Sequence, residues 1–113
     1  MTRNQKLYLE DMLEAITKIK RYTSTLSFDE FALNEMVIDA VIRNFEIIGE
    51  AAGRISSDLQ FLYPEVPWYE MKGMRNLAAH EYFRVDLQIV WKTIQDSLPE
   101  LGVLIQRVLS EQP

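Results

Sequence analysis

The chain has 113 residues, 48% of them hydrophobic, which fits one compact domain over residues 1–113 with a modest core. Its formal charge of −5 argues against a general nucleic-acid binder, since such proteins are usually basic, although an enzyme that acts on RNA needs to be basic only locally. The absence of cysteine excludes disulfides, thiolate chemistry and most zinc sites. No apolar run approaches the roughly 18 residues that span a bilayer, and the polar N-terminus shows no signal peptide. We therefore expect a soluble cytoplasmic protein that makes no membrane contact.

Apolar residues recur every three to four positions, and the chain has only four glycines and four prolines. This pattern predicts helices. Thr2 and Gln5 form a possible capping box that opens a first helix, which should end near Tyr22. The buried stripe of this helix consists of Leu9, Met12, Leu13, Ile16 and Ile19. After a short polar link, Ser27 and Glu30 form a second capping box, which predicts a single helical turn.

A long helix is predicted from about Asn34 to Ser56. Its apolar seam comprises Val37, Val41, Ile48 and Ile55, with Asn44 as the polar member. Small residues gather near its end, namely Gly49, Ala51, Ala52 and Gly53. Small side chains let another helix approach closely. We expect that helix to belong to the same chain, and a helix of a second subunit is the less favoured alternative. Glu50 lies among them and is interpreted as a structural hydrogen-bond acceptor in preference to a catalyst.

Residues 57–67 carry Pro64 and Pro67 and are interpreted as a loop. Proline is tolerated in the first turn of a helix, so Pro67 is compatible with a helix that runs from about Trp68 to Ala79.

A last helical stretch is predicted to begin near Asp86. Its apolar seam alternates steps of four and three without a slip, through Leu87, Trp91, Ile94, Leu98, Leu101, Ile105 and Val108. Pro99 lies inside this seam and has no N–H to donate, and Ser97 with Glu100 is able to cap a new helix there. The unbroken seam predicts a kink at this point and no change of direction. The whole chain therefore predicts an all-α fold, an antiparallel bundle of four main helices, or five if the kinked one is counted twice.

Residues 75–82 contain the one histidine of the chain, His80, five positions after Arg75 and two before Tyr82. Arginine binds phosphate, histidine transfers protons near neutral pH, and tyrosine offers a hydroxyl that can be modified. On an ideal helix Arg75 and His80 point about 140° apart, whereas Asn76 and His80 share a face. The arginine and histidine meet on one substrate if the helix ends near His80, or if a second copy of the segment faces the first across a two-fold axis.

RNA cleavage gives a chemical reason to prefer the second geometry. Attack by a ribose 2′-hydroxyl on the adjacent phosphate needs a general base, a general acid and a cation that stabilises the phosphorane. One chain supplies one histidine, whereas a symmetric dimer supplies two, with two arginines and without a metal ion. The plainer alternative is that His80 merely interacts with the C-terminal end of its helix.

The string Met74-Arg75-Asn76-Leu77-Ala78-Ala79-His80-Glu81-Tyr82-Phe83 resembles the signature of the HEPN superfamily. More narrowly it resembles the HepT toxins of HepT–MntA toxin–antitoxin pairs, whose motif is Arg, four residues, His, any residue, Tyr. Flanking strings agree with this family: 48–52 on the long helix, 66–68 before the motif, and Val85-Asp86 followed by Trp91 after it.

This resemblance implies an all-helical, homodimeric ribonuclease that needs no metal ion or other cofactor. Arg75 would bind the scissile phosphate of the RNA, His80 would transfer protons, and Asn76 would position the substrate or the histidine. The partner implied is an MntA-like nucleotidyltransferase antitoxin, which would transfer AMP to Tyr82 and so block the site.

A local basic cleft would reconcile RNA binding with the negative net charge, and its candidate members are Arg43, Arg54, Lys72, Arg75 and Arg84. Two other functions compete with the ribonuclease. One is a non-catalytic helical module that docks a nucleotidyltransferase and helps it bind substrate. The other is a metal-binding bundle, which a chain with one histidine fits poorly.

Overall fold

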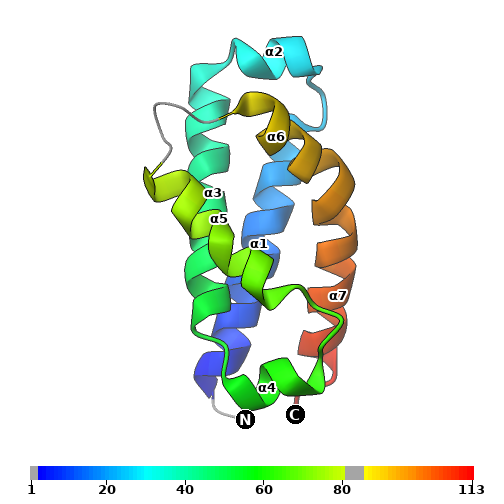
Figure 1. Ribbon diagram of the computed structural model, residues 1–113. Coiled ribbons are helices and arrows are strands. Elements are labelled where there is room, and N and C mark those ends of the chain that lie inside the picture. Colours follow the sequence, from blue (N-terminus) through cyan, green and yellow to red (C-terminus); the bar gives the residue numbers. More distant parts are fainter. Residues whose placement is uncertain (1–2, 81–85) are drawn as a thin grey trace.

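The computed structural model describes residues 3–80 and 86–113, and the side chains of 5–76 and 86–113. Over these ranges the fold is all-α, as predicted, and contains no strand (Figure 1). The helices are α1 (Arg3–Thr23), α2 (Phe28–Ala32), α3 (Glu35–Gly53), α4 (Ser57–Leu62), α5 (Trp68–His80), α6 (Leu87–Lys92) and α7 (Leu98–Ser110), with a π-helical turn, η2 (Thr93–Ser97), between the last two. None of these helices is both long and apolar enough to cross a membrane.

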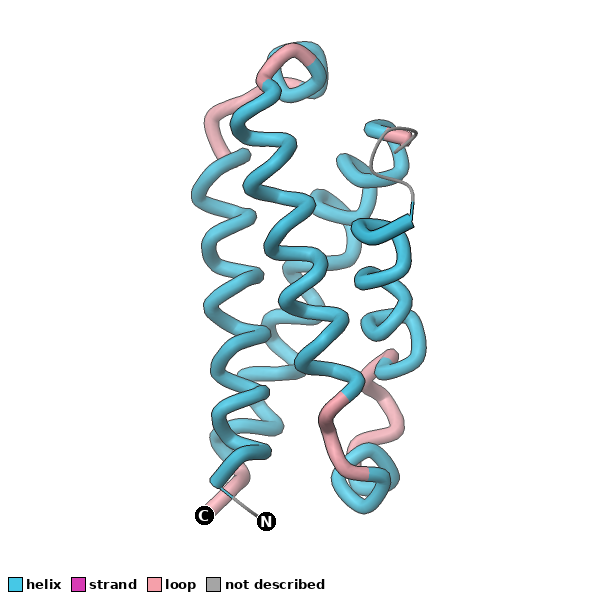
Figure 2. The backbone as a smooth tube through the Cα atoms, turned by 90° about the vertical axis from the view of Figure 1, so that its left-hand side faces the viewer, coloured by secondary structure: helices cyan, strands magenta, loops and turns pink. Residues whose placement is uncertain are grey.

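The long helix α3 lies at the centre of the bundle, between α1 and α5 (Figure 2). Its predicted seam is confirmed, because Val41, Ile48 and Ile55 are buried and Val37 packs against the core. The amide of Asn44 is also buried and donates to the Ala40 carbonyl at 2.8 Å, so the polar member of the seam is satisfied inside its own helix.

The two ends of the bundle are closed by short helices. At one end Ser27 and Glu30 form the predicted capping box, with bonds of 2.9 and 3.1 Å, and start α2. The first capping box falls on Thr2, which lies outside the described residues. Its proposed partner, Gln5, instead reaches from α1 to the end of α3, where it binds the Arg54 carbonyl and the Ser56 N–H.

At the other end the prediction of a loop over 57–67 is wrong for residues 57–62, which form α4, and is confirmed for residues 63–67. Ser56, expected inside the long helix, caps α4 by accepting a hydrogen bond from the Leu59 N–H at 3.2 Å. Leu59 is the buried residue of α4. A helix of six residues with one buried side chain is too short to show a helical repeat of apolar residues. The two prolines that follow it led to the prediction of a loop.

The last stretch of chain bends without a break. Asp86 caps α6, and the predicted seam is confirmed, with Ile94, Leu98 and Ile105 among its buried members. The Ser97 cap is wrong, since its side chain makes no capping bond. The backbone instead widens into η2, where the Leu98 N–H donates to the Thr93 carbonyl, and this extra residue in the turn precedes Pro99.

Candidate functional site

A groove of about 530 Å³ runs between α3 and α5 and holds the described part of the predicted motif. Its cationic side chains are Arg54 from the end of α3 and Lys72 and Arg75 from α5. Its other lining residues are Gly49, Glu50, Gly53, Tyr69, Gly73 and Asn76. Of the three glycines, Gly73 leaves the surface of α5 open, and the three cations favour a polyanion in this groove.

Gly49 sets the distance between the two helices at Arg75. A Cβ placed on Gly49 would lie 2.6 Å from the Arg75 Cβ and 2.9 Å from its Cα, closer than side chains in proteins pack. Since these are backbone and Cβ atoms, no rotamer change relieves the contact. The small-residue segment of α3 therefore packs against α5 of the same chain, as expected, and Gly49 contacts the backbone of Arg75.

Arg75 is exposed into the groove, and its one described ion pair is weak. Its Nε lies 4.0 Å from a Glu50 carboxylate oxygen, and the two side chains are 60% and 46% exposed. Exposed pairs contribute about 0–1 kcal/mol, so a phosphate can displace this carboxylate at little cost. Glu50 was expected to be a structural acceptor, but the structure places it at the groove surface beside the arginine.

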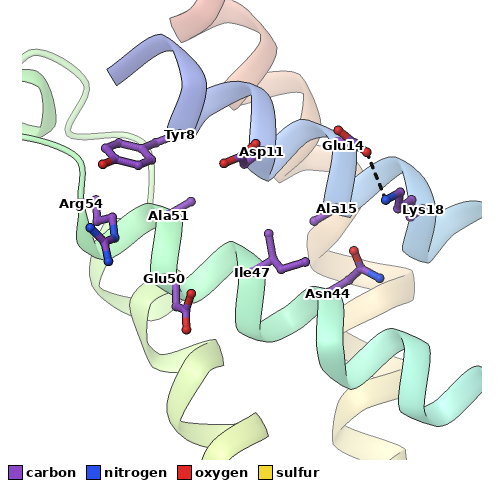
Figure 3. A pocket seen from close by; sticks show the side chains of 10 residues that line it. All are labelled: Tyr8, Asp11, Glu14, Ala15, Lys18, Asn44, Ile47, Glu50, Ala51 and Arg54. Atoms are coloured by element: carbon purple, nitrogen blue, oxygen red, sulfur yellow. Dashed lines mark ion pairs between the residues drawn. The ribbon is translucent and has the colours of Figure 1, made fainter. Parts of the chain in front are cut away.

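Contacts to α1 fix the position of Arg54. Gln5 binds the Arg54 carbonyl at 3.0 Å and accepts from the Ser56 N–H at 2.7 Å, which ties the end of α3 to the first helix. The Arg54 guanidinium also lies 6.0 Å from the centre of the Tyr8 ring. Figure 3 shows the neighbouring groove between α1 and α3, which Glu50 and Arg54 also line, so these two residues form the ridge between the grooves.

The structure brings together part of the basic cleft predicted from sequence. Arg54, Lys72 and Arg75 share the groove, whereas Arg43 does not line it and pairs with Glu46 within α3. Arg84 and Tyr82 lie outside the described residues. For His80 the backbone alone is described, as the last residue of α5.

The helical path of α5 through His80 bears on how arginine and histidine could meet. Both residues belong to α5, whose described part ends at His80, so the helix end near His80 that the first geometry requires is present and the backbone alone does not choose between the two geometries. On an ideal helix the two residues are about 140° apart around the helix axis.

The opposite side of α5 has the opposite charge. A second groove there, between α5 and η2–α7, has an apolar floor and is lined by the carboxylates of Glu65, Glu70, Asp96 and Glu100. Across the described residues no three acidic or histidine side chains come close enough to form a metal-binding group. The groove on the α3 side of α5 thus holds three cations and one carboxylate, whereas the groove on the α7 side holds four carboxylates, so a polyanion is favoured on the α3 side.

Sequence reasoning missed Tyr69 and Gly73 as lining residues of the groove. Tyr69 is 85% exposed although it follows the buried Trp68, whose indole N–H donates to the Tyr63 carbonyl at 3.0 Å. The spacing of Tyr69, Gly73 and Asn76, in steps of four and three, was the available signal, since it places them on one face of the helix.

Comparison with known proteins gives a consistent result. Residues 12–108 match the family described as HepT-like, "Ribonuclease HepT-like". The chain is 45% identical to a protein of Thermococcus cleftensis named "Probable ribonuclease HepT" over 89% of this chain and 92% of that protein. It is 39% identical to a Methanocaldococcus jannaschii protein with the provisional name RNase MJ1380, over 88% and 91% of the two chains. A second protein of that organism, provisionally named RNase MJ1216, is 35% identical over 96% and 90%. No solved structure gives a significant match.

Proposed function

Because this chain belongs to the HepT-like ribonuclease family of the HEPN superfamily, we propose that it cleaves RNA in the groove between α3 and α5, without a metal ion. The observation that carries this proposal is the exposure of Arg75 in a groove that also holds Lys72 and Arg54. These cations give an acidic protein the local basic surface that an RNA substrate needs.

The proposed reaction is transesterification within the RNA. A general base removes the proton of a ribose 2′-hydroxyl, and its oxygen attacks the adjacent phosphorus. Arg75 stabilises the negative charge of the phosphorane, and a general acid protonates the departing 5′-oxygen. The products are a 2′,3′-cyclic phosphate and a 5′-hydroxyl. His80 supplies the proton transfers, and Asn76, four positions earlier on the same helix, positions the substrate or the histidine.

The site is proposed to be completed by a second copy of the chain. The reaction calls for a base and an acid, and each chain has one histidine. Arg75 and His80 also point about 140° apart on an ideal helix, which favours a site to which two copies contribute them. A homodimer with the two α5 helices facing each other supplies a pair of each residue.

We further propose that the chain is the toxin of a toxin–antitoxin pair and that an MntA-like nucleotidyltransferase neutralises it by transferring AMP to Tyr82. The adduct adds bulk and a negative phosphodiester near Arg75, where it competes with RNA. With the partner enzyme, ATP and magnesium, intact-mass spectrometry should show a gain of about 329 Da per AMP as cleavage is lost. Tyr82→Phe should remain unmodified, and an equal adduct on that variant would place the acceptor elsewhere.

The ribonuclease activity is tested with purified protein and labelled RNA in excess EDTA. We expect cyclic-phosphate or 3′-phosphate ends, and no cleavage of DNA of the same sequence because DNA lacks the attacking hydroxyl. Arg75→Ala and His80→Ala should each remain folded, and the histidine variant should lose about 10²- to 10⁴-fold in rate. Wild-type rates in both variants would show contamination, and a chain that binds RNA and the nucleotidyltransferase but never cleaves would fit the docking alternative.

A further inference from the structure

We propose that Tyr69 forms a stacking subsite for an unpaired base, so that the groove takes single-stranded RNA beside the cleavage position. This inference rests on the proposed ribonuclease function and adds the form of its substrate. It is carried by the position and exposure of one aromatic side chain among the three cations of the groove.

Tyr69 has no structural role that would explain its exposure. Its side chain is 85% exposed, and within the described part of the chain it makes no hydrogen bond, ion pair or ring contact. The start of α5 is already anchored by its neighbours, since Trp68 and Met71 are buried. A large exposed aromatic ring contributes nothing to folding, but it offers a flat surface to a ligand.

The register of α5 places this ring beside the phosphate-binding side chains. Tyr69, Gly73 and Asn76 lie within about 60° of one another around the helix, and Lys72 precedes Gly73 by one position. Nothing lies within 4 Å of a Cβ built on Gly73, so the helix surface between Tyr69 and Asn76 is open. Six residues separate Tyr69 from Arg75, which is about 9 Å along the helix axis.

The Lys72 side chain covers part of the opposite wall. Its Cγ, Cδ and Cε atoms are 3.7 to 3.8 Å from a Cβ built on Gly53, so its aliphatic stem runs along α3 at the point where that helix lacks a side chain. Lys72 and Arg54 line the same groove as Tyr69 and Arg75. A strand that places a phosphate at Arg75 and a base at Tyr69 therefore lies among these cations.

These features favour single-stranded RNA over a duplex. Bases in a duplex are already stacked and cannot offer a face to a protein ring, whereas unpaired bases stack on aromatic side chains. Stacking on one base is worth about 5- to 150-fold in affinity. It does not depend on base identity, because every base has a flat face, so Tyr69 should fix the strand without selecting one sequence.

Binding to non-cleavable RNA tests the subsite apart from catalysis. A short 2′-fluoro RNA lacks the attacking hydroxyl, and its dissociation constant is measured by fluorescence anisotropy with the full chain. One abasic nucleotide is then moved along the strand. In the wild type we expect one position at which the missing base weakens binding by about 5- to 150-fold. In Tyr69→Ala the intact RNA should bind that much more weakly, and the abasic position should make no further difference.

Two variants separate stacking from other effects. Tyr69→Phe keeps the ring and should bind within about two-fold of the wild type. Tyr22→Ala removes an aromatic ring on α1, outside the cationic groove and outside the groove that Tyr69 shares with Phe61, and should leave binding unchanged. An equal loss in Tyr22→Ala, or an abasic effect that persists in Tyr69→Ala, would overturn the subsite. If the abasic effect behaves as expected but Arg75→Ala still cleaves at the wild-type rate, the proposed catalytic site fails and the stacking subsite stands.

Discussion

Gly49 is the residue on which the geometry of the site depends most directly. It lets α5 approach α3 so closely that a Cβ at this position would collide with the backbone of Arg75. The spacing of small residues along α3 predicted a close helix contact within the chain. It could not predict that the contact falls on the motif arginine, because the register between two helices is set by their packing and not by either sequence alone.

We predict that Gly49→Ala destabilises the protein and impairs RNA cleavage together. Overpacking at a contact without a flexible neighbour costs about 1–3 kcal/mol, and moving α5 displaces Arg75. The measurements are chemical denaturation and the rate of cleavage. Gly102→Ala is the matched control, since its new Cβ meets Ile16 at an ordinary 3.5 Å in a helix where alanine is favoured, so its stability should stay the same or rise. A Gly49→Ala protein of wild-type stability would refute the close approach.

The elements differ in how well the sequence predicted them. The long seams of α1, α3 and α7 were confirmed, because many apolar positions repeat the helical period. The two wrong predictions concern segments whose backbone conformation does not depend on a long apolar repeat. α4 is held by the Ser56 cap and one buried leucine, and the turn before Pro99 widens into a π-helix where a cap was expected. At the first place Pro64 and Pro67 suggested a loop, and at the second Ser97 and Glu100 suggested a new helix cap.

The capping box of α2 gives a prediction for pH. The hydrogen bond from the Ser27 backbone N–H lowers the pKa of Glu30, and the Ser27 side chain adds to the effect. A carboxyl group with a lowered folded pKa stabilises the protein above its unfolded value, near 4.5, and this stabilisation is lost as the pH falls through the folded pKa.

We therefore expect the melting temperatures of the wild type and Glu30→Gln to differ most near neutral pH and to converge in acid. Glutamine keeps an acceptor for the Ser27 N–H but does not titrate. Thermal unfolding of both proteins from about pH 3 to 7 measures the difference. A constant difference over this range would show that the charge of Glu30 does not contribute to the cap.

The charge distribution of the protein favours an RNA ligand on one side of α5. The net charge is −5, and the groove on the α7 side carries four carboxylates, whereas the α3 side carries Arg54, Lys72 and Arg75 with one carboxylate, Glu50. Composition indicated that any basic cleft had to be local. It could not identify the members, because Arg43 and Arg54 are equally plausible in sequence and only the fold places one in the groove and the other in a pair with Glu46.

The salt dependence of RNA binding should show whether RNA contacts the cations of the α3-side groove. For single strands the logarithm of affinity falls by about 0.7 per phosphate contact for each unit of log salt. We predict that Arg54→Gln and Lys72→Gln each make this slope shallower and weaken binding. Arg43→Gln removes the same charge outside the groove and should keep the wild-type slope. Equal slopes in all three variants would mean that RNA senses net charge and not the groove.

We propose that two copies of the chain form one cleavage site. The test is a heterodimer of wild type and the Arg75→Ala/His80→Ala variant, purified through two different tags and assayed before subunits exchange. A tagged wild-type pair serves as the control, and light scattering should give twice the 13.2 kDa chain mass for both. If the site needs both histidines, the mixed dimer should lose at least about 100-fold in cleavage rate relative to the control. Half the control activity would mean that each chain carries a complete site, and would contradict the paired mechanism.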